Sequence, residues 1–337
     1  MYVALLGLVL HTLYGATADG SSTLKRFESS QVAMGTTVVV VLYAPDEATA
    51  NRAFAAAFKR IAFLDKMMSD YDSDSELMRL CSKSPTANAI PVSRDLNEVL
   101  SYAQDMSEKS EGAFDVTVGP LTKLWRRARR REEMPDPQQL AEALAAVGYK
   151  NLIVHKQQST VELRKPNMRI DLGGIAQGYA ADVAMEELQK LGINRALVNV
   201  SGEILGWDPP PDSDAWTVGI APLEPNQPPS HFVRLVHNAV ATSGDAWQFA
   251  VINGRRYSHV LDPHTGIGLT VHCGVSVVAP TAMAADAMST AVGVLGVERG
   301  LAFIEKMPDT AALIVRQEDG HVTVHESSKL ETYLKKP

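Results

Sequence analysis

The chain has 337 residues, of which 45% are hydrophobic and 21% charged, an ordinary globular composition that suits one large domain or two of about 150 residues. Its formal net charge of −7 opposes long-range attraction to polyphosphate chains, so nucleic acid is not an expected partner. Two cysteines, Cys81 and Cys273, are too few for a disulfide framework and show no zinc-ligand spacing. We expect both to be packing residues, and one disulfide between them is the alternative.

The start of the chain has features of an export signal. Residues 1–10 are apolar, and Ala16-Thr17-Ala18 supplies the small-x-small pattern that signal peptidase recognises. We expect residues 1–18 to be a signal peptide, the protein to be periplasmic or otherwise exported, and residues 24–337 to form a single domain. No Lys or Arg precedes the apolar stretch, so a start codon further upstream is open. No lipoprotein cysteine follows it, and no later stretch is expected to span a membrane.

Hydrophobic periodicity predicts the secondary structure in chain order. A strand at 38–43 is followed by helices at 45–66, 96–110 and 137–147. Short strands follow at 152–155, 160–163, 168–172, 196–200 and 216–220, interrupted by helices at 175–191 and 281–295. The proline-rich stretch 209–230 is expected to be a loop or hairpin connection. Because helices and strands do not alternate regularly, we predict an α+β fold with a largely antiparallel sheet and packed helices.

One strongly basic run stands out in this acidic chain. It contains Lys123, Arg126, Arg127, Arg129, Arg130 and Arg131. The run could form an anion or partner patch, but a solvated helix or loop face is the favoured interpretation.

The segment from Asp171 to Gly178 has two glycines at a turn between a predicted strand and a predicted helix. Glycines let the backbone approach an anion, and the first N–H groups of a helix stabilise it. Taken alone, such a turn is more often a tight connection. The chain contains no G-x-G-x-x-G and no P-loop motif, so a nucleotide would need a different cradle.

Three oxygen-bearing side chains share one face of the helix predicted at 281–295. Asp286, Ser289 and Thr290 are spaced i, i+3 and i+4. Mg²⁺ prefers hard oxygen ligands, so the three could share one cation. By itself the set is equally well explained as a polar stripe among alanines.

His259 lies in a strand-like run that ends in the turn around Asp262 and Pro263. An imidazole, with an ordinary pKa of about 6.5, is the side chain best suited to accept a proton near neutrality. Most single histidines are structural, and this chain has 9. A hydrolase triad of Ser258, His259 and Asp262 is rejected, because neighbours on a strand point to opposite faces and no nucleophile elbow is present.

Taken together, these segments resemble the ApbE family, the FAD:protein FMN transferases, over most of residues 34–296. Seven pieces fit the family in order and spacing: Met34-Gly35-Thr36, Met68 to Tyr71 with Ser75-Glu76-Leu77, Gly112 to Asp115, Asp171 to Gly178, Ser243-Gly244-Asp245, Tyr257 to Gly266, and Thr281 to Asp286. The resemblance implies an ApbE-like fold.

The resemblance also implies a site. Flavin or adenine contacts would come from Met34, Tyr71, Ala113, Phe114, Asp115, Asp171, Gln177 and Val260. Mg²⁺ would lie between the backbone carbonyl of Gly174 and the side chains of Asp286 and Thr290, with Ser289 at a position where some members have an acidic ligand.

The implied reaction attaches the FMN half of FAD through a phosphoester to a Ser or Thr of an acceptor flavoprotein, with release of AMP. His259 would remove the hydroxyl proton. The family's usual acceptors are subunits of membrane redox complexes. No complete copy of the acceptor motif Asp-Gly-x-Ser/Thr-Gly-Ala-Ser/Thr occurs in the chain, so we expect it to modify another protein.

Two other functions compete with this one. A FAD pyrophosphatase would use water in place of the hydroxyl and release FMN and AMP, and a tyrosine at position 71 favours transfer over hydrolysis. An inactive flavin-binding scaffold is the other, and the presence of His259 and Asp286 argues against it.

Overall fold

The computed structural model describes residues 24–224, 226–318 and 320–335, so the predicted signal segment lies outside the described residues. Its centre is an eight-stranded sheet in which every neighbouring pair is antiparallel. In spatial order the strands are β1 (Lys25–Ala33), β2 (Thr36–Ala44), β6 (Ala196–Val200), β7 (Glu203–Gly206), β10 (Asn238–Gly244), β13 (His272–Ala279), β14 (Ala311–Glu318) and β15 (His321–Glu326). The predicted α+β class with a largely antiparallel sheet is confirmed.

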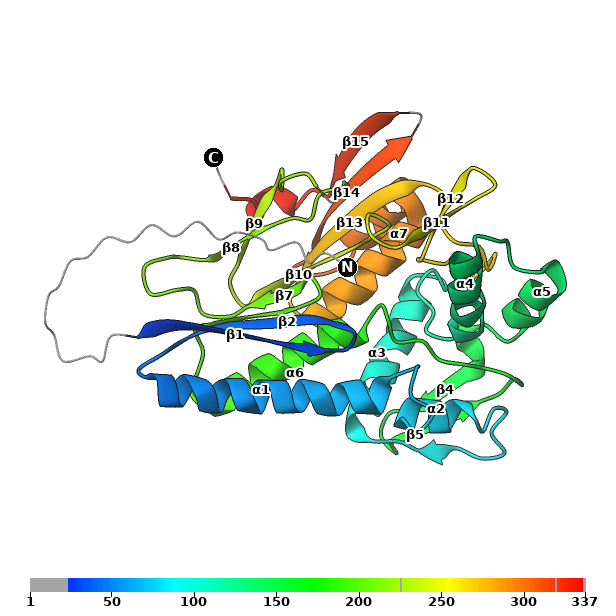
Figure 1. The fold of residues 1–337 in the computed structure, drawn as a ribbon, viewed down its shortest axis with the longest axis horizontal. Coiled ribbons are helices and arrows are strands. Elements are labelled where there is room, and N and C mark those ends of the chain that lie inside the picture. Colours follow the sequence, from blue (N-terminus) through cyan, green and yellow to red (C-terminus); the bar gives the residue numbers. More distant parts are fainter. Residues whose placement is uncertain (1–23, 225, 319, 336–337) are drawn as a thin grey trace, which may run out of the picture.

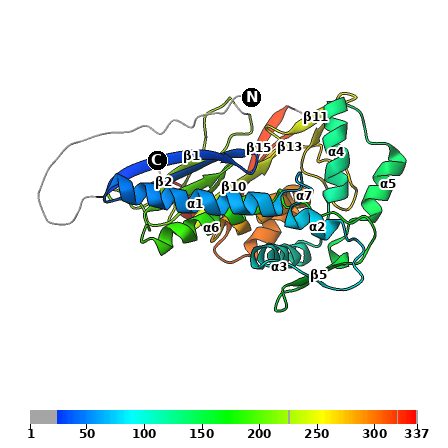
Figure 2. The same cartoon turned by 60° about the horizontal axis from the view of Figure 1, so that its bottom comes forward.

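Three long helices cover one face of this sheet (Figures 1 and 2): α1 (Glu47–Met68), α6 (Ala176–Lys190) and α7 (Ala282–Glu305). Helix α1 begins where the Asp46 side chain accepts a hydrogen bond from the Thr49 N–H at 2.7 Å, which satisfies a donor that the helix leaves free. Its buried residues recur with helical spacing, from Ala53 and Phe54 to Ile61 and Leu64. They form an apolar stripe that packs in the main core.

The other face of the sheet is covered by the hairpin of β8 (Trp216–Gly219) and β9 (Phe232–Leu235) with the short helix η2 (Leu330–Thr332). Trp216, Val233 and Leu330 are buried there against sheet residues such as Val240 and Leu313. The sheet is therefore apolar on both faces, and the body of the molecule has three layers.

The remaining elements lie beyond one end of the sheet (Figure 1). They are α2 (Glu76–Cys81), α3 (Arg94–Lys109), α4 (Gly119–Arg131), α5 (Pro137–Ala145), η1 (Tyr149–Asn151), a small sheet of β3 (Ile90–Pro91), β5 (Thr160–Leu163) and β4 (Leu152–His155), and the hairpin of β11 (Phe249–Ile252) and β12 (Arg255–Ser258). A separate small core joins α4 to this hairpin through Leu121, Trp125, Ala250 and Ile252.

Most predicted elements are confirmed within a few residues, but the strand predicted at 168–172 is wrong. Only an isolated bridge between Val118 and Arg169 forms there. The Asp171 N–H donates to the Val116 carbonyl at 2.8 Å, and the Gly119 N–H donates to the Arg169 carbonyl at 3.1 Å. The segment is thus held beside the turn that begins α4 instead of joining a sheet.

Three further expectations are revised by the structure. The basic run forms α4, in which Lys123, Arg127, Arg130 and Arg131 are exposed but Arg126 and Arg129 are half-buried, so it is more than a solvated face.

Among the described residues α7 is long and apolar enough to cross a membrane by length and composition, although much of it packs in the main core. Cys81 and Cys273 are both free, which excludes the bridge left open above.

Candidate active site

The site is built around the close approach of α6 to α7. Gly178 lies in α6 where a β-carbon would stand 2.3 Å from the backbone carbonyl oxygen of Ala282, so only glycine allows the two helices to come this close. This approach lets the Gly178 N–H donate to Oδ2 of Asp286 at 3.1 Å. Asp182 on α6 accepts from the Ala282 and Met283 N–H groups at 2.7 and 2.9 Å and fixes the start of α7.

Asp286 and Glu203 form a pair of buried carboxyl groups. Burial raises the pKa of both above their ordinary values, and the charge of Asp286 raises that of Glu203 further. Oε2 of Glu203 is buried and has no hydrogen-bond partner among the described residues. Neither carboxyl group has an ion-pair partner there either. Buried acidic groups without a counter-charge are costly, and a divalent cation would offset that cost.

The predicted metal-binding groups of the glycine turn and α7 do lie together. A β-carbon on Gly174 would stand 3.0 Å from Oγ1 of Thr290 and 3.5 Å from the ring of Phe114. The Gly174 backbone, the Thr290 hydroxyl and the Phe114 ring therefore meet at one point. The Ser289 hydroxyl is buried and donates to the Asp286 carbonyl at 2.8 Å, so it is engaged within its own helix.

The glycine turn leads into the N-terminus of α6, where the Asp286 side chain of α7 accepts from the Gly178 N–H. Ile175 precedes α6 and makes no side-chain cap. The Ala176 N–H donates instead to the Leu172 carbonyl at 2.8 Å, and the Gly178 N–H donates to Asp286 at 3.1 Å. The helix dipole at this end favours an anion. Nε2 of Gln177, the second residue of α6, donates to the Met34 carbonyl at 3.4 Å, which brings two predicted flavin contacts together. The Met34 N–H donates to Asp65 at 2.8 Å and fixes the β1–β2 turn.

Arg126 joins two of the predicted cofactor residues. Its guanidinium pairs with Asp70, lies 3.5 Å from Oδ2 of Asp171, and stacks over the Tyr71 ring at 4.3 Å from the ring centre. Tyr71 is 81% exposed, so its other ring face is free to contact a ligand. Oδ1 of Asp171 also accepts from the Gly173 N–H at 2.8 Å and shapes the glycine turn.

Asp115 is buried and uses both oxygens within the protein. Oδ1 accepts from the N–H and the hydroxyl of Thr117 at 2.8 and 2.7 Å, and Oδ2 accepts from the Tyr149 N–H at 2.8 Å. Burial raises its pKa. Asp115 thus fixes the loop that carries Ala113 and Phe114, both of which are buried.

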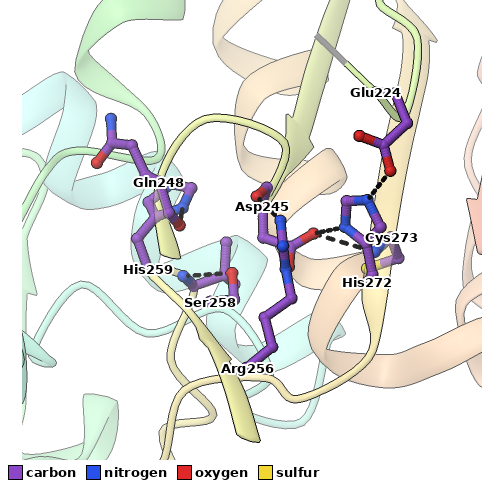
Figure 3. Close-up of polar contacts among 9 residues, drawn as sticks. Glu224, Asp245, Gln248, Arg256, Ser258, His259, His272 and Cys273 are labelled. Atoms are coloured by element: carbon purple, nitrogen blue, oxygen red, sulfur yellow. Dashed lines mark hydrogen bonds and ion pairs between the residues drawn. The ribbon is translucent and has the colours of Figure 1, made fainter. Parts of the chain in front are cut away.

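His259 follows directly after β12 and is held by one backbone carbonyl. The carbonyl of Gln248 accepts from the His259 N–H at 3.0 Å and contacts Nδ1 at 3.2 Å (Figure 3). Because a carbonyl can only accept, Nδ1 carries the proton and Nε2 keeps its lone pair. Burial lowers the pKa of His259, and the nearby charge of Arg129 lowers it further, so the ring is neutral near pH 7.

Residues beside His259 have structural roles. Ser258 is buried, and its hydroxyl accepts from the Val260 N–H at 3.0 Å, which supports the rejection of Ser258 as a nucleophile. Val260 itself is buried. Arg129 on α4 contacts Oε1 of Gln248 at 3.4 Å. Gln248 therefore contacts Arg129 through its side chain and His259 through its backbone carbonyl.

Asp245 anchors the strands around this histidine. Its buried carboxylate pairs with Arg256, and Oδ1 accepts from Nδ1 of His272 at 2.7 Å and from the Cys273 N–H at 3.1 Å (Figure 3). Nε2 of His272 reaches Glu224 at 3.3 Å. The Ser243-Gly244-Asp245 piece therefore ties the β11–β12 hairpin to β13.

The structure thus brings the predicted residues together in linked groups along α4, α6 and α7. Sequence reasoning missed Arg126, Arg129, Gln248 and Glu203 as members. The two arginines were visible as a basic run, and Glu203 as a charge directly before the apolar residues Ile204 and Leu205. Gln248 gave no signal, since it acts through a backbone carbonyl that every residue has.

Comparison with known proteins agrees with this geometry. The model of the ApbE family matches residues 34–314. The chain is 34% identical over 268 residues to the FAD:protein FMN transferase of Haemophilus influenzae, an alignment that covers 77% of this chain and 78% of that protein. It is 30% identical over 327 residues to the one from Treponema pallidum, covering 92% and 90% of the two chains.

Solved structures show the same fold. The flavin transferase ApbE from Vibrio cholerae superposes with a TM-score of 0.83 at 29% identity, covering 92% of this chain and 100% of that one. The apbe protein from Thermotoga maritima gives a TM-score of 0.81 at 27% identity, covering 93% and 100%.

Proposed function

The chain belongs to the ApbE family, and from that membership we propose that it transfers the FMN half of FAD to a Ser or Thr hydroxyl of another protein with the help of Mg²⁺. It is a transferase whose substrates are FAD and an acceptor protein. One observation carries the proposal. Nε2 of His259 is free to accept a proton, and α4 links this histidine to the proposed cofactor residues. On α4, Arg129 contacts Gln248, which holds His259, and Arg126 stacks over Tyr71.

The residues of α6 and α7 fit a hard divalent cation. We assign its ligands to the Gly174 carbonyl, Asp286 and Thr290, with Ser289 beside them. Gly174 and Thr290 meet, Asp286 precedes Thr290 by one turn of α7, and the buried carboxyl pair has no counter-charge among the described residues. When bound, Mg²⁺ offsets the charge of the pyrophosphate and makes its phosphorus more open to attack.

The protein's own groups position the pyrophosphate and the nucleophile. The positive end of the α6 dipole and the glycine turn before it suit the anionic phosphates, and the exposed face of Tyr71 suits an aromatic ring. Nε2 of His259 takes the proton from the acceptor hydroxyl. The hydroxyl oxygen forms a new bond to the FMN phosphorus, the bond from that phosphorus to the bridging oxygen breaks, and AMP leaves with the bridging oxygen.

The test combines the protein with FAD, Mg²⁺ and a protein domain bearing the family acceptor motif, followed by intact mass measurement and detection of AMP. One FMN gained per acceptor, abolished by EDTA, is the expected result. AMP and free FMN without a labelled acceptor would instead make the protein a pyrophosphatase. The absence of both products would leave a flavin-binding scaffold.

His259→Ala should lower the transfer rate by at least ~10²-fold, because the acceptor hydroxyl then has no base. FAD affinity should change little, which a flavin-fluorescence titration measures. His321→Ala, at an exposed histidine on β15, is the control and should behave as wild type. A His259→Ala enzyme that transfers FMN at the wild-type rate would remove this residue from the mechanism.

The acceptor and the compartment are further parts of the proposal. We propose a subunit of a membrane redox complex as the acceptor, which the family resemblance supports, and export of the mature protein, which the apolar start and the Ala16-Thr17-Ala18 pattern support.

A further inference from the structure

Glu203 is a charged residue at the start of β7, an inner strand of the large sheet. All four residues of β7 are buried, and Glu203 itself is 8% exposed. A carboxylate in such a position normally has a cation or several hydrogen-bond donors as partners, because its removal from water is costly. Oε2 of Glu203 is fully buried and has no hydrogen-bond partner among the described residues. Its environment therefore lacks a component.

The alternation of side chains along β7 turns this carboxyl group toward the helices. Ile204 belongs to the core beneath the β8–β9 hairpin, whereas Leu205 belongs to the main core on the helix side of the sheet. Residues two apart on a strand share a face, so Glu203 points to the same side as Leu205. Its partner on β6, Val200, agrees, since directly paired residues share a face and Val200 is also in the main core. Helices α6 and α7 both pack on β7 at this face.

Asp286 reaches the same part of the core from α7. It is 5% exposed. Burial raises the pKa of Glu203, and the charge of Asp286 raises it further, so the two carboxyl groups are close enough to repel. Asp182 is a third carboxyl group nearby, but the N–H groups of Ala282 and Met283 already donate to it. Among the described residues, no lysine, arginine or histidine is among the charges that shift Asp286 or Glu203.

A divalent cation supplies what this pair lacks. Mg²⁺ takes hard carboxylate oxygens as ligands, and its double charge balances two carboxylates. Asp286 already belongs to the ligand set proposed above, and the Ser289 hydroxyl beside it donates to a backbone carbonyl at 2.8 Å. Glu203 is thus the group near Asp286 whose oxygen is still without a partner.

We propose that Glu203 is a direct ligand of the same Mg²⁺ ion, adding a carboxylate from the sheet to the groups of α7 and the glycine turn. The inference rests on the proposed function, which places the metal at Asp286 and Thr290, and extends it to a residue of β7. Bound metal gives Oε2 of Glu203 its missing partner. The metal site then holds the sheet and α7 together.

Direct metal binding tests the inference without any transfer of FMN. Mn²⁺ is the probe, because the electron paramagnetic resonance signal of the free ion reports how much metal remains unbound. It is titrated into the purified protein in the absence of FAD. Glu203→Gln should bind Mn²⁺ at least ~10-fold more weakly than wild type, since even the loss of a group that only supports a metal ligand typically costs that much.

The matched control is Glu186→Gln. Glu186 is an exposed residue of α6 whose charge acts on Asp182, so this variant removes a negative charge from the same neighbourhood but no proposed ligand. It should bind Mn²⁺ as the wild type does. Equal affinities of wild type and Glu203→Gln would overturn the inference, as would an equal loss of affinity in both variants.

A thiolate at the same position distinguishes a direct ligand from a supporting group. Glu203→Cys should bind Cd²⁺ with the ultraviolet charge-transfer band of a cadmium–thiolate bond, because soft thiolates prefer soft metals. Ile204→Cys is the control, since its side chain lies on the opposite face of β7. Cys81 and Cys273 are free in every variant, so the wild-type spectrum is subtracted. A band of equal strength in both cysteine variants, or in neither, would overturn direct coordination.

Asp286→Asn separates this inference from the proposed function. If the wild type binds Mn²⁺ and Asp286→Asn does not, the proposed metal site holds, and full affinity in Glu203→Gln would overturn the role of Glu203 alone. If the wild type binds no Mn²⁺, the metal site and the role of Glu203 are both overturned. FMN transfer is measured separately, so its presence or absence does not enter this comparison.

Discussion

At the scale of single residues, the site depends on how charges surround His259. Arg129 approaches from α4, the Gln248 carbonyl holds the ring, and Asp245 and Asp171 contribute weaker opposing charge. Burial and Arg129 lower the pKa of the imidazole. The base form therefore persists to lower pH than in an exposed histidine.

Arg129→Gln should move the acid limb of the transfer rate to higher pH. A protonated imidazole cannot accept the hydroxyl proton, so the rate falls as pH drops through the pKa of His259. Without the guanidinium charge this pKa rises, and activity is lost sooner on acidification. The measurement is kcat/KM across about pH 5 to 8.

Arg130→Gln is the control for that profile, because Arg130 is exposed and is not among the charges that shift His259. The two profiles should differ. If both variants keep the wild-type midpoint, Arg129 does not set the protonation of the base.

Asp286→Asn should abolish stabilisation by Mg²⁺. Saturating metal at about 100 times its Kd adds roughly 2.7 kcal/mol to the stability of a protein that binds it only when folded. Removing the carboxylate of the proposed ligand set removes that gain, whereas Ser289→Ala should keep most of it because the Ser289 hydroxyl is engaged with the helix backbone. Thermal unfolding with and without MgCl₂ gives the answer, and an Asp286→Asn protein still stabilised by Mg²⁺ would place the metal elsewhere.

At the scale of elements, the approach of α6 to α7 aligns the groups that we propose as metal ligands. The Gly178 N–H meets Asp286 because no side chain separates the two helices, and Gly174 meets Thr290 one turn away. Neither contact follows from either helix alone.

Gly178→Ala should destabilise the protein by about 1–3 kcal/mol, since the added methyl group meets a backbone carbonyl that cannot rotate away. Gly293→Ala, in the interior of α7 with its nearest neighbour 3.9 Å from the new β-carbon, should be neutral or stabilising by up to about 1 kcal/mol. Urea denaturation of the two variants measures both values. Similar stabilities would show that the helices can separate without cost.

At the scale of the whole molecule, the sheet is buried on both faces, and the proposed site residues lie on α4, α6 and α7 and next to the β11–β12 hairpin (Figures 1 and 2).

Expression in a Gram-negative host should yield a periplasmic protein whose sequence starts at Asp19, because Ala16-Thr17-Ala18 precedes it. N-terminal sequencing of the periplasmic fraction tests this. Full-length protein found only in the cytoplasm would contradict export.

The sequence alone determined the periodic elements, the α+β class and the family, because these depend on local patterning and on ordered short motifs. It placed the α1 and α6 helices and the strands of 152–155, 160–163 and 196–200 correctly. It also proposed His259 and the helix face of Asp286 and Thr290 as site residues, and these roles stay predictions. It failed at 168–172, where hydrogen bonds to the start of α4 replaced a sheet.

Only the tertiary structure decided which charges meet. Arg126 joins Tyr71 and Asp171, Glu203 meets Asp286 inside the core, and Gln248 holds His259 through its carbonyl. These partners are far apart in the chain or act through the backbone, so no spacing rule reveals them. Their energies depend on burial and distance, and both exist only once the helices have packed on the sheet.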